Sequence, residues 1–226
     1  MKYRVEDKYC CTGQEMYRIQ QRLKTVLKAD DNESSDKGYR VVSLYFDDLT
    51  DSCFHAVEDG IYSRHKYRIR IYNDSLDMIK LEVKEKQGSR VFKMSKSITI
   101  KEMHSLMRGQ CIPASFSAED PAFLFNLAIQ TQALRPKVVV AYERKAYIYA
   151  PGNVRITLDR NIRASRQTAD FGARDISYTP LREQDAVLEI KYDELIPQFI
   201  LQLLELNSMQ QTAYSKYCLC RAKTIL

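Results

Sequence analysis

Charged residues alternate with apolar residues inside several β-strand patterns, and this arrangement constrains the fold more than any other feature of the sequence. In Arg68-Ile69-Arg70-Ile71 the arginines fall on one face of a strand and the isoleucines on the other, because successive side chains point to opposite faces. Six further segments repeat the pattern. Their charged faces carry Glu6, Lys8, Lys80, Glu82, Lys84, Lys93, Arg144, Arg155, Asp159, Glu189 and Lys191.

A solvated outer face with cross-strand ion pairs would explain any one of these strands. Seven strands with the same pattern leave two arrangements. One is a sheet whose whole second face is open to water. The other is a closed barrel with a charged lumen, whose apolar outer face is covered by helices. The many amphipathic helix patterns favour the barrel.

Periodicity and turn composition place the elements along the chain. Capping boxes at Thr12 with Glu15 and at Thr99 with Glu102 predict two helix starts, and Pro121 and Pro197 mark two more. A short helical or irregular piece is expected over 49–59 and a terminal helix over 215–225. Besides the first strand, strands are expected over 39–47, 62–72, 78–86, 90–100, 137–149, 154–160 and 186–192. About eight strands and four or five helices, without a repeat or linker, predict one α+β domain over residues 1–226.

Composition excludes several classes of protein. The 226 residues include 35 Lys and Arg against 29 Asp and Glu, a formal net charge of +6, and 45% are hydrophobic, which is too much for a disordered or fibrous chain. No apolar run of about 18 residues occurs, so we expect a soluble, unprocessed, cytoplasmic protein. The six cysteines lack paired spacing and the three histidines are isolated, which predicts reduced thiols and no zinc site.

A barrel with this lumen would hold more cations than carboxylates, which is costly unless a polyanion balances them. The carboxylates Glu6, Glu82, Asp159 and Glu189 could pair with neighbouring cations, or could act as the hard oxygen ligands that Mg²⁺ or Mn²⁺ uses at a phosphate site. Both alternatives stay open for Glu189, and the ion pair is the simpler expectation for the other three.

Eight segments, in this order, resemble the VTC-domain polyphosphate polymerases, a branch of the CYTH-like triphosphate tunnel metalloenzymes. The resemblance implies an eight-stranded antiparallel tunnel in which basic side chains hold the triphosphate of ATP and an acidic residue holds a metal ion. The segments are Tyr3-Arg4-Val5-Glu6-Asp7-Lys8-Tyr9, Ser43-Leu44-Tyr45-Phe46-Asp47, Lys66-Tyr67-Arg68-Ile69-Arg70-Ile71-Tyr72, Leu81-Glu82-Val83-Lys84, Tyr142-Glu143-Arg144-Lys145-Ala146-Tyr147, Val154-Arg155-Ile156-Thr157-Leu158-Asp159, Val187-Leu188-Glu189-Ile190-Lys191 and Tyr214-Ser215-Lys216-Tyr217.

The resemblance also implies site residues. Glu189 would be the ligand of Mn²⁺ or Mg²⁺, Lys191 shares its face, and Lys216 would contact phosphate near the tunnel end. The remaining implied phosphate ligands are Lys8, Arg68, Arg70, Lys84, Lys93, Arg144 and Arg155. One departure concerns the fourth strand, where relatives often have Lys-x-Arg and this chain has Lys93-Met94-Ser95-Lys96, which leaves Lys96 on the opposite strand face unless a bulge intervenes.

The resemblance implies transfer of the γ-phosphoryl group of ATP to a growing inorganic polyphosphate chain, with Arg68, Arg70, Arg144, Arg155 and Glu189 as catalytic residues. Hydrolysis of tripolyphosphate or a nucleoside triphosphate, and polyphosphate binding without chemistry, are the alternatives. We do not expect a nucleic-acid partner, because many tyrosines fall on strand faces or helix packing positions. Fungal relatives carry an inositol-phosphate-sensing domain and membrane helices that this sequence lacks, so we expect no direct membrane insertion and any attachment through a partner protein.

Overall fold

The computed structural model describes residues 4–30, 38–88, 90–181, 186–206, 209–212 and 215–225. Tyr3 and Tyr214, which begin two of the matching segments, lie outside the described residues. The strands are β1 Arg4–Cys11, β2 Lys28–Ala29, β3 Tyr39–Asp47, β4 Ser63–Tyr72, β5 Ser75–Gln87, β6 Arg90–Ile98, β7 Arg135–Tyr149, β8 Val154–Ser165, β9 Thr179–Pro180 and β10 Ala186–Tyr192. The helices are α1 Gly13–Val26, α2 Ser52–Glu58, α3 Ile100–Met107, α4 Pro121–Gln132, α5 Gln198–Leu204 and α6 Lys216–Ile225, with 3₁₀ turns at Pro151–Asn153 and Thr168–Asp170.

Eight strands close into a ring, as the sequence predicted. The antiparallel order is β7-β3-β4-β5-β6-β1-β10-β8, and β8 pairs back onto β7 to complete it. β2 and β9 are two-residue additions to β7 and β8. The described part of the chain has six α-helices, one more than the upper number expected, because the 49–59 piece is a full helix. No described helix has the length and apolarity needed to span a membrane.

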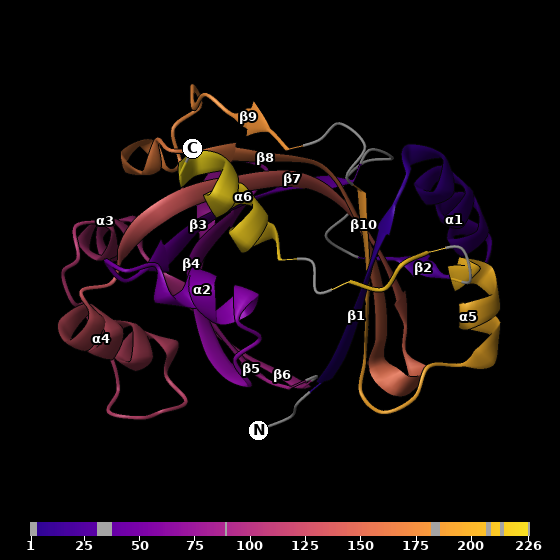
Figure 1. The fold of residues 1–226 in the computed structure, drawn as a ribbon, viewed down its shortest axis with the longest axis horizontal. Coiled ribbons are helices and arrows are strands. Elements are labelled where there is room, and N and C mark those ends of the chain that lie inside the picture. The colour runs from indigo at the N-terminus through magenta and orange to yellow at the C-terminus, as the bar shows by residue number, and fades with distance from the viewer. Residues whose placement is uncertain are drawn as a thin grey trace.

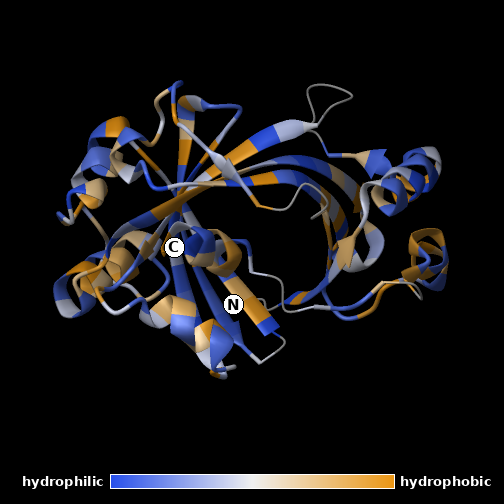
Figure 2. Ribbon diagram, turned by 45° about the horizontal axis from the view of Figure 1, so that its top comes forward, coloured by the Kyte–Doolittle hydropathy of each residue, from blue (hydrophilic) through white to orange (hydrophobic). Residues whose placement is uncertain are grey.

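Helices cover the outer face of the ring on two sides. Figure 1 shows α3 and α4 beside one part of the ring, α1 and α5 beside the opposite part, and α6 across its front. One core joins Ile69 and Leu81 of the strands to Phe125 of α4, and a second joins Leu188 to Leu23 of α1. Along the strands, hydrophilic and hydrophobic residues alternate around the ring (Figure 2). The predicted division between a charged inner face and an apolar outer face therefore holds for most of the barrel.

One part of the inner face is apolar. Val140 of β7 and Ala164 of β8 pack there against Tyr217 and Cys220 of α6, which forms a third core. On β8 a bulge turns the apolar side chains inward: the β7–β8 register shifts by one residue near Asn161, whose φ is +53°. β8 continues to Ser165, five residues beyond the predicted end, because the extra residue breaks the alternation without ending the strand.

Candidate functional site

A cavity inside the ring holds about 120 Å³ of space that water can reach. Among the described residues, ten cationic side chains and two carboxylates line it. The cations are Lys8, Arg64, Lys66, Arg68, Arg70, Lys84, Lys86, Arg144, Lys191 and Lys216, and the carboxylates are Glu6 and Glu189. Tyr45, Tyr142 and Tyr217 also contribute to the wall.

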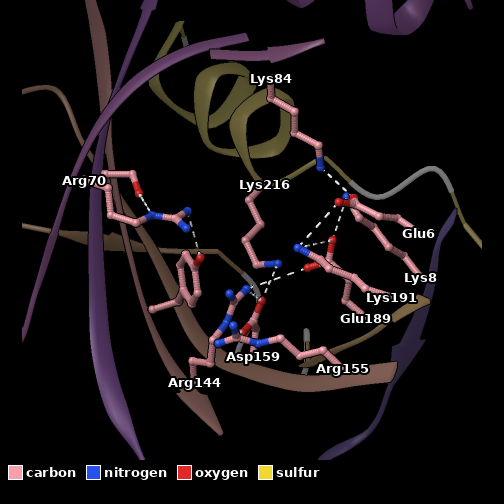
Figure 3. Close-up of polar contacts among 12 residues, drawn as sticks. Glu6, Lys8, Arg70, Lys84, Arg144, Arg155, Asp159, Glu189, Lys191 and Lys216 are labelled. Atoms are coloured by element: carbon pink, nitrogen blue, oxygen red, sulfur yellow. Dashed lines mark hydrogen bonds and ion pairs between the residues drawn. The ribbon is translucent and has the colours of Figure 1, made fainter. Parts of the chain in front are cut away.

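Nine of the predicted site residues lie in this lining, and Figure 3 shows how several of them converge. Glu82 and Asp159 lie behind the lining and bond to its cations. Lys93 stands outside the lining but donates to Glu82 over 2.8 Å. Arg155 also stands outside it, where it pairs with Asp30 and donates to the Tyr39 hydroxyl over 3.2 Å.

Glu82 anchors one arginine cluster. Its Oε2 accepts from Arg68 Nε at 2.6 Å and Nη2 at 2.5 Å, and lies 3.8 Å from Arg70 Nη1. Burial would raise the pKa of Glu82, but Arg68, Arg70 and Lys93 hold it well below the usual value. The Glu82 side chain is only 2% exposed, so its charge is fixed beneath the arginines.

Tyrosines orient the same arginines. Arg68 donates to the Tyr45 hydroxyl over 3.0 Å, and Arg70 donates to Tyr142 over 3.2 Å and to the Ser43 hydroxyl over 3.0 Å. Each guanidinium is therefore held in place by hydroxyl groups of neighbouring strands. The remaining donor positions can address a ligand in the cavity.

Asp159 anchors a second cluster, which includes a residue of α6. Arg144 binds it through two hydrogen bonds of 2.6 and 2.8 Å, and Lys216 Nζ lies 2.6 Å from Oδ2. Burial disfavours the charge on Lys216, but Asp159 and Glu189 raise its pKa above the usual value. Lys216 therefore stays protonated, and Figure 3 shows it pointing from α6 toward Asp159.

The position of α6 depends on contacts that follow Lys216 in the chain. The Tyr217 ring stacks on Tyr45 with centroids 5.2 Å apart, and its hydroxyl donates to buried Asp47. Arg221 donates to both oxygens of Asp51 at 3.1 and 2.9 Å. These contacts hold the start of α6 at the cavity.

Lysine and glutamate groups meet on the β1, β5 and β10 side of the cavity. Lys84 Nζ lies 2.6 Å from Glu6 Oε2, and Lys191 Nζ lies 3.5 Å from Oε1. Burial would raise the pKa of Glu6, but Lys84 and Lys191 lower it to about 2. Burial lowers the pKa of Lys84 to about 7, with Glu6 opposing the shift and Lys8 and Lys191 adding to it.

Glu189 differs from the other three carboxylates. Lys8, Arg144 and Lys191 lie 3.7 to 3.8 Å from its oxygens, and within the described ranges it accepts no shorter bond. Thr157, its cross-strand neighbour on β8, is fully buried, and its hydroxyl has no hydrogen-bond partner among the described residues. Burial opposes the Glu189 charge, but Lys191, Lys8 and Lys216 keep its pKa well below the usual value. The oxygen atoms of Glu189 and Thr157 can therefore still bind a further group.

Three lining cations escaped prediction: Arg64, Lys66 and Lys86. The signal was present, because they continue the alternation of Arg68 on β4 and of Lys84 on β5. Lys96, by contrast, lies on the outer face, where its ammonium pairs with Asp120 over 2.9 Å at the N-cap of α4. No bulge turns Lys96 inward, because the β5–β6 register runs without a shift. Lys96 therefore does not replace the arginine of the relatives.

Three solved structures share this fold over nearly the whole chain. A protein from Bacillus halodurans described as a candidate adenylate cyclase has a TM-score of 0.56 at 11% identity, over 95% of this chain and 94% of that chain. A candidate adenylate cyclase from Vibrio parahaemolyticus has a TM-score of 0.53 at 10% identity, over 96% and 97%. A Pyrococcus horikoshii protein has a TM-score of 0.50 at 15% identity, over 98% and 99%. At these identities the likeness concerns the fold alone.

No curated protein sequence matches the chain. The model of the VTC domain family, however, matches residues 3–225. This match spans all eight strands of the ring together with α6, and it confirms the resemblance found in the strand motifs. The chain belongs to the VTC domain family.

Proposed function

We propose that this protein is a metal-dependent polyphosphate polymerase that transfers the γ-phosphoryl group of ATP to the end of an inorganic polyphosphate chain and releases ADP. The observation that carries the proposal is the lining of the cavity, with ten cations against two carboxylates. Such an imbalance is favourable only when a polyanion enters. Membership of the VTC domain family supports the same activity.

The proposed reaction needs no general base. A terminal phosphate is already an anion at neutral pH, so the protein must bring two anions into line and stabilise charge that moves to the leaving oxygen. Fixed donors do this best, because they need no reorganisation during the reaction. Glu82 and Asp159 provide that fixation by holding Arg68 and Arg144 before substrate binds.

The proposal assigns roles by chemistry. Guanidinium groups bind phosphate oxygens in bidentate fashion, whereas ammonium groups act as point charges. The β- and γ-phosphates are assigned to Arg68, Arg70 and Arg144, which line the cavity, whereas the predicted ligand Arg155 pairs with Asp30 outside the lining. Alignment of the chain is assigned to Lys8, Lys84, Lys191 and Lys216 of the lining, and Lys93 supports them through Glu82.

Glu189 is the residue that would hold Mg²⁺ or Mn²⁺. Glu6, Glu82 and Asp159 each have a cation within 2.6 Å. Among the described residues, Glu189 has no cation closer than 3.7 Å and lies beside the Thr157 hydroxyl, which has no partner there. Mg²⁺ is commonly bound by one or two carboxylates together with substrate phosphates, which fits this donor set. When bound, the ion would neutralise charge on the β- and γ-oxygens. The described residues contain no group of three acidic, His or Cys ligands, so phosphate oxygens would complete the site.

Incubation with ATP and Mn²⁺, followed by size resolution of the products, tests the function. Long chains with ADP support the polymerase, orthophosphate alone indicates a hydrolase, and bound polyphosphate without turnover indicates a binding module. We expect Glu189→Gln to abolish chain synthesis and the control Lys80→Gln to retain it, because Lys80 lies outside the cavity lining and donates to Ser97. Chain synthesis at the parent rate by Glu189→Gln would refute the metal role.

A further inference from the structure

The lining cations fall into two groups according to their carboxylate partners. Seven have a carboxylate oxygen within 4.0 Å, at Glu6, Glu82, Asp159 or Glu189. Among the residues that the structure describes, the other three have none. We call these three the mouth cations: Arg64, Lys66 and Lys86.

Neutral groups satisfy the mouth cations only in part. Arg64 Nη1 donates to the carbonyl of Ile61 over 2.9 Å, just after α2, and Lys66 donates to the hydroxyl of Ser215 over 2.8 Å, just before α6. These bonds use one donor nitrogen of each side chain. A guanidinium has five N–H donors and an ammonium three, so with respect to the described residues most of their donors remain open to a ligand.

The strand register forces these cations against each other. Arg64 lies directly opposite Lys86 on β4 and β5, and Lys66 lies directly opposite Lys84. Like charges in directly opposed positions destabilise a sheet. The next pair along the same strands, Arg68 and Glu82, is of opposite charge and is bonded. The pair after that, Arg70 and Lys80, is again of like charge, but Lys80 lies outside the cavity lining. Within the lining, the cations without a carboxylate partner therefore lie at the end that adjoins α2 and the start of α6.

We propose that the mouth cations form a second phosphate subsite, which binds the part of a linear inorganic polyphosphate that extends beyond the three phosphates held deeper in the cavity. This inference rests on the proposed function and adds to it three residues, Arg64, Lys66 and Lys86, as the ones that hold the extending chain. It also assigns the α2 and α6 side of the cavity as the side on which the chain continues.

The length of the row of inward-facing cations on β4 supports a ligand longer than a triphosphate. From Arg70 to Arg64 the inward-facing cations of β4 extend over six residues, which is about 20 Å of strand. One triphosphate group is much shorter than this row. A nucleobase or ribose at the mouth would leave the three charges unbalanced, whereas each further phosphate brings its own negative charge.

The acid–base behaviour of these groups agrees with the geometry. Burial, with Lys8 and Arg64 nearby, lowers the pKa of Lys66 to about 8, and burial with the same two neighbours lowers the pKa of Lys86. Glu6 on β1 opposes the shift at Lys86, and the thiols of Cys218 and Cys53 oppose it at Lys66, but burial outweighs them. Phosphate oxygens at the mouth would remove this penalty on the charged forms.

The test is calorimetric titration of the whole protein with two probes, tripolyphosphate and a linear polyphosphate several times longer. Lys66→Gln/Lys86→Gln is the test variant, and Arg64 is kept because it bonds the carbonyl of Ile61. Lys80→Gln is the matched control: Lys80 shares the strand and face of Lys86 and donates to a hydroxyl, but it lies outside the cavity lining.

We expect the double variant to bind the long chain about tenfold or more weakly, since charge-assisted bonds are lost, while its affinity for tripolyphosphate changes less than twofold. The salt dependence of long-chain binding should become shallower by about two released ions, because two cation contacts are removed. The control should match the parent with both probes.

Several results would overturn the inference. Equal losses for both probes would place these lysines in the triphosphate site, and no loss for either would remove them from binding. A single-stranded oligonucleotide that binds as tightly as polyphosphate, with the same loss in the variant, would make nucleic acid the ligand. A parent that binds tripolyphosphate but gains nothing from the longer chain would refute only this subsite, whereas a parent that binds neither probe would refute the proposed function as well.

Discussion

Phosphate binding to this protein should take up protons near pH 8. Lys84 carries the prediction, because burial lowers its pKa to about 7 despite Glu6, and Lys66 adds to it with a pKa of about 8. Phosphate oxygens beside these ammonium groups favour their charged forms and raise both pKa values. At a pH above the pKa values that these two lysines have in the free protein, phosphate binding must therefore be accompanied by proton uptake.

The magnitude follows from the two values. At pH 8 a lysine of pKa about 7 is about one-tenth protonated and one of pKa about 8 is half protonated, so full protonation on binding requires about 0.9 and about 0.5 proton. For the long chain, which reaches Lys66, the total is about 1.4 protons at pH 8 and only about 0.1 at pH 6, whereas tripolyphosphate should take up only the roughly 0.9 proton of Lys84 at pH 8. Affinity for phosphate should correspondingly fall as the pH rises through 7 to 8, because the lysines must then be protonated at a cost.

Calorimetry of tripolyphosphate and long-chain binding in buffers of different ionisation enthalpy measures the uptake. The terminal phosphates also titrate, with a pKa of about 6, so each parent value is compared with Lys84→Gln at the same pH. That variant should lose about 0.9 proton of uptake at pH 8 and almost nothing at pH 6, while Lys80→Gln should match the parent. Heats that do not depend on the buffer at pH 8, or equal uptake by parent and Lys84→Gln, would refute the reasoning.

Three further predictions concern single contacts. Glu82→Gln should lower the free energy of unfolding in urea by about 3 kcal/mol, because the Arg68 and Lys93 charges then remain partly buried without a counter-charge; added tripolyphosphate should restore part of this, and a variant as stable as the parent would contradict it. Lys96→Gln should leave the Kd for tripolyphosphate unchanged by titration, because Lys96 pairs with Asp120 outside the barrel, and a tenfold weaker Kd would show that this residue reaches the site after all. Tyr217→Phe should cost about 1–3 kcal/mol in the same urea assay, since buried Asp47 loses a donor, and an unchanged midpoint would mean that the stacking on Tyr45 alone holds α6.

Strand alternation left an open sheet and a closed barrel as alternatives, and the amphipathic helix patterns favoured the barrel. Alternation then predicted most of the lining. The alternation of Arg68 with Ile69 along β4 shows which side chains face inward. Closure of the ring then brings β1, β5 and β10 together. The VTC motifs added Lys216, which lies on a helix and has no strand parity to reveal it. Arg64, Lys66 and Lys86 lie toward the strand ends, where a charged side chain is equally typical of a solvated position.

Partners within the lumen could not be predicted, because they depend on the register between strands distant in sequence. Asp159 pairs with Arg144 and Lys216 only because β8 lies beside β7 and α6 crosses the opening. Arg155 has the same parity as Asp159, yet it pairs with Asp30 outside the cavity lining. The bulge at Asn161 was equally hidden, since a single extra residue leaves no compositional signal.

That bulge gives β8 two different inner faces. Before it, Thr157 and Asp159 turn inward to the charged chamber; after it, Ile162 and Ala164 turn inward to form part of the apolar seat of α6. The number of residues between Asp159 and Ile162, more than their identity, therefore sets the boundary between chamber and seat. Variation in the length of this one strand would exchange binding surface for helix docking surface, whereas substitutions at the same positions would leave the boundary in place.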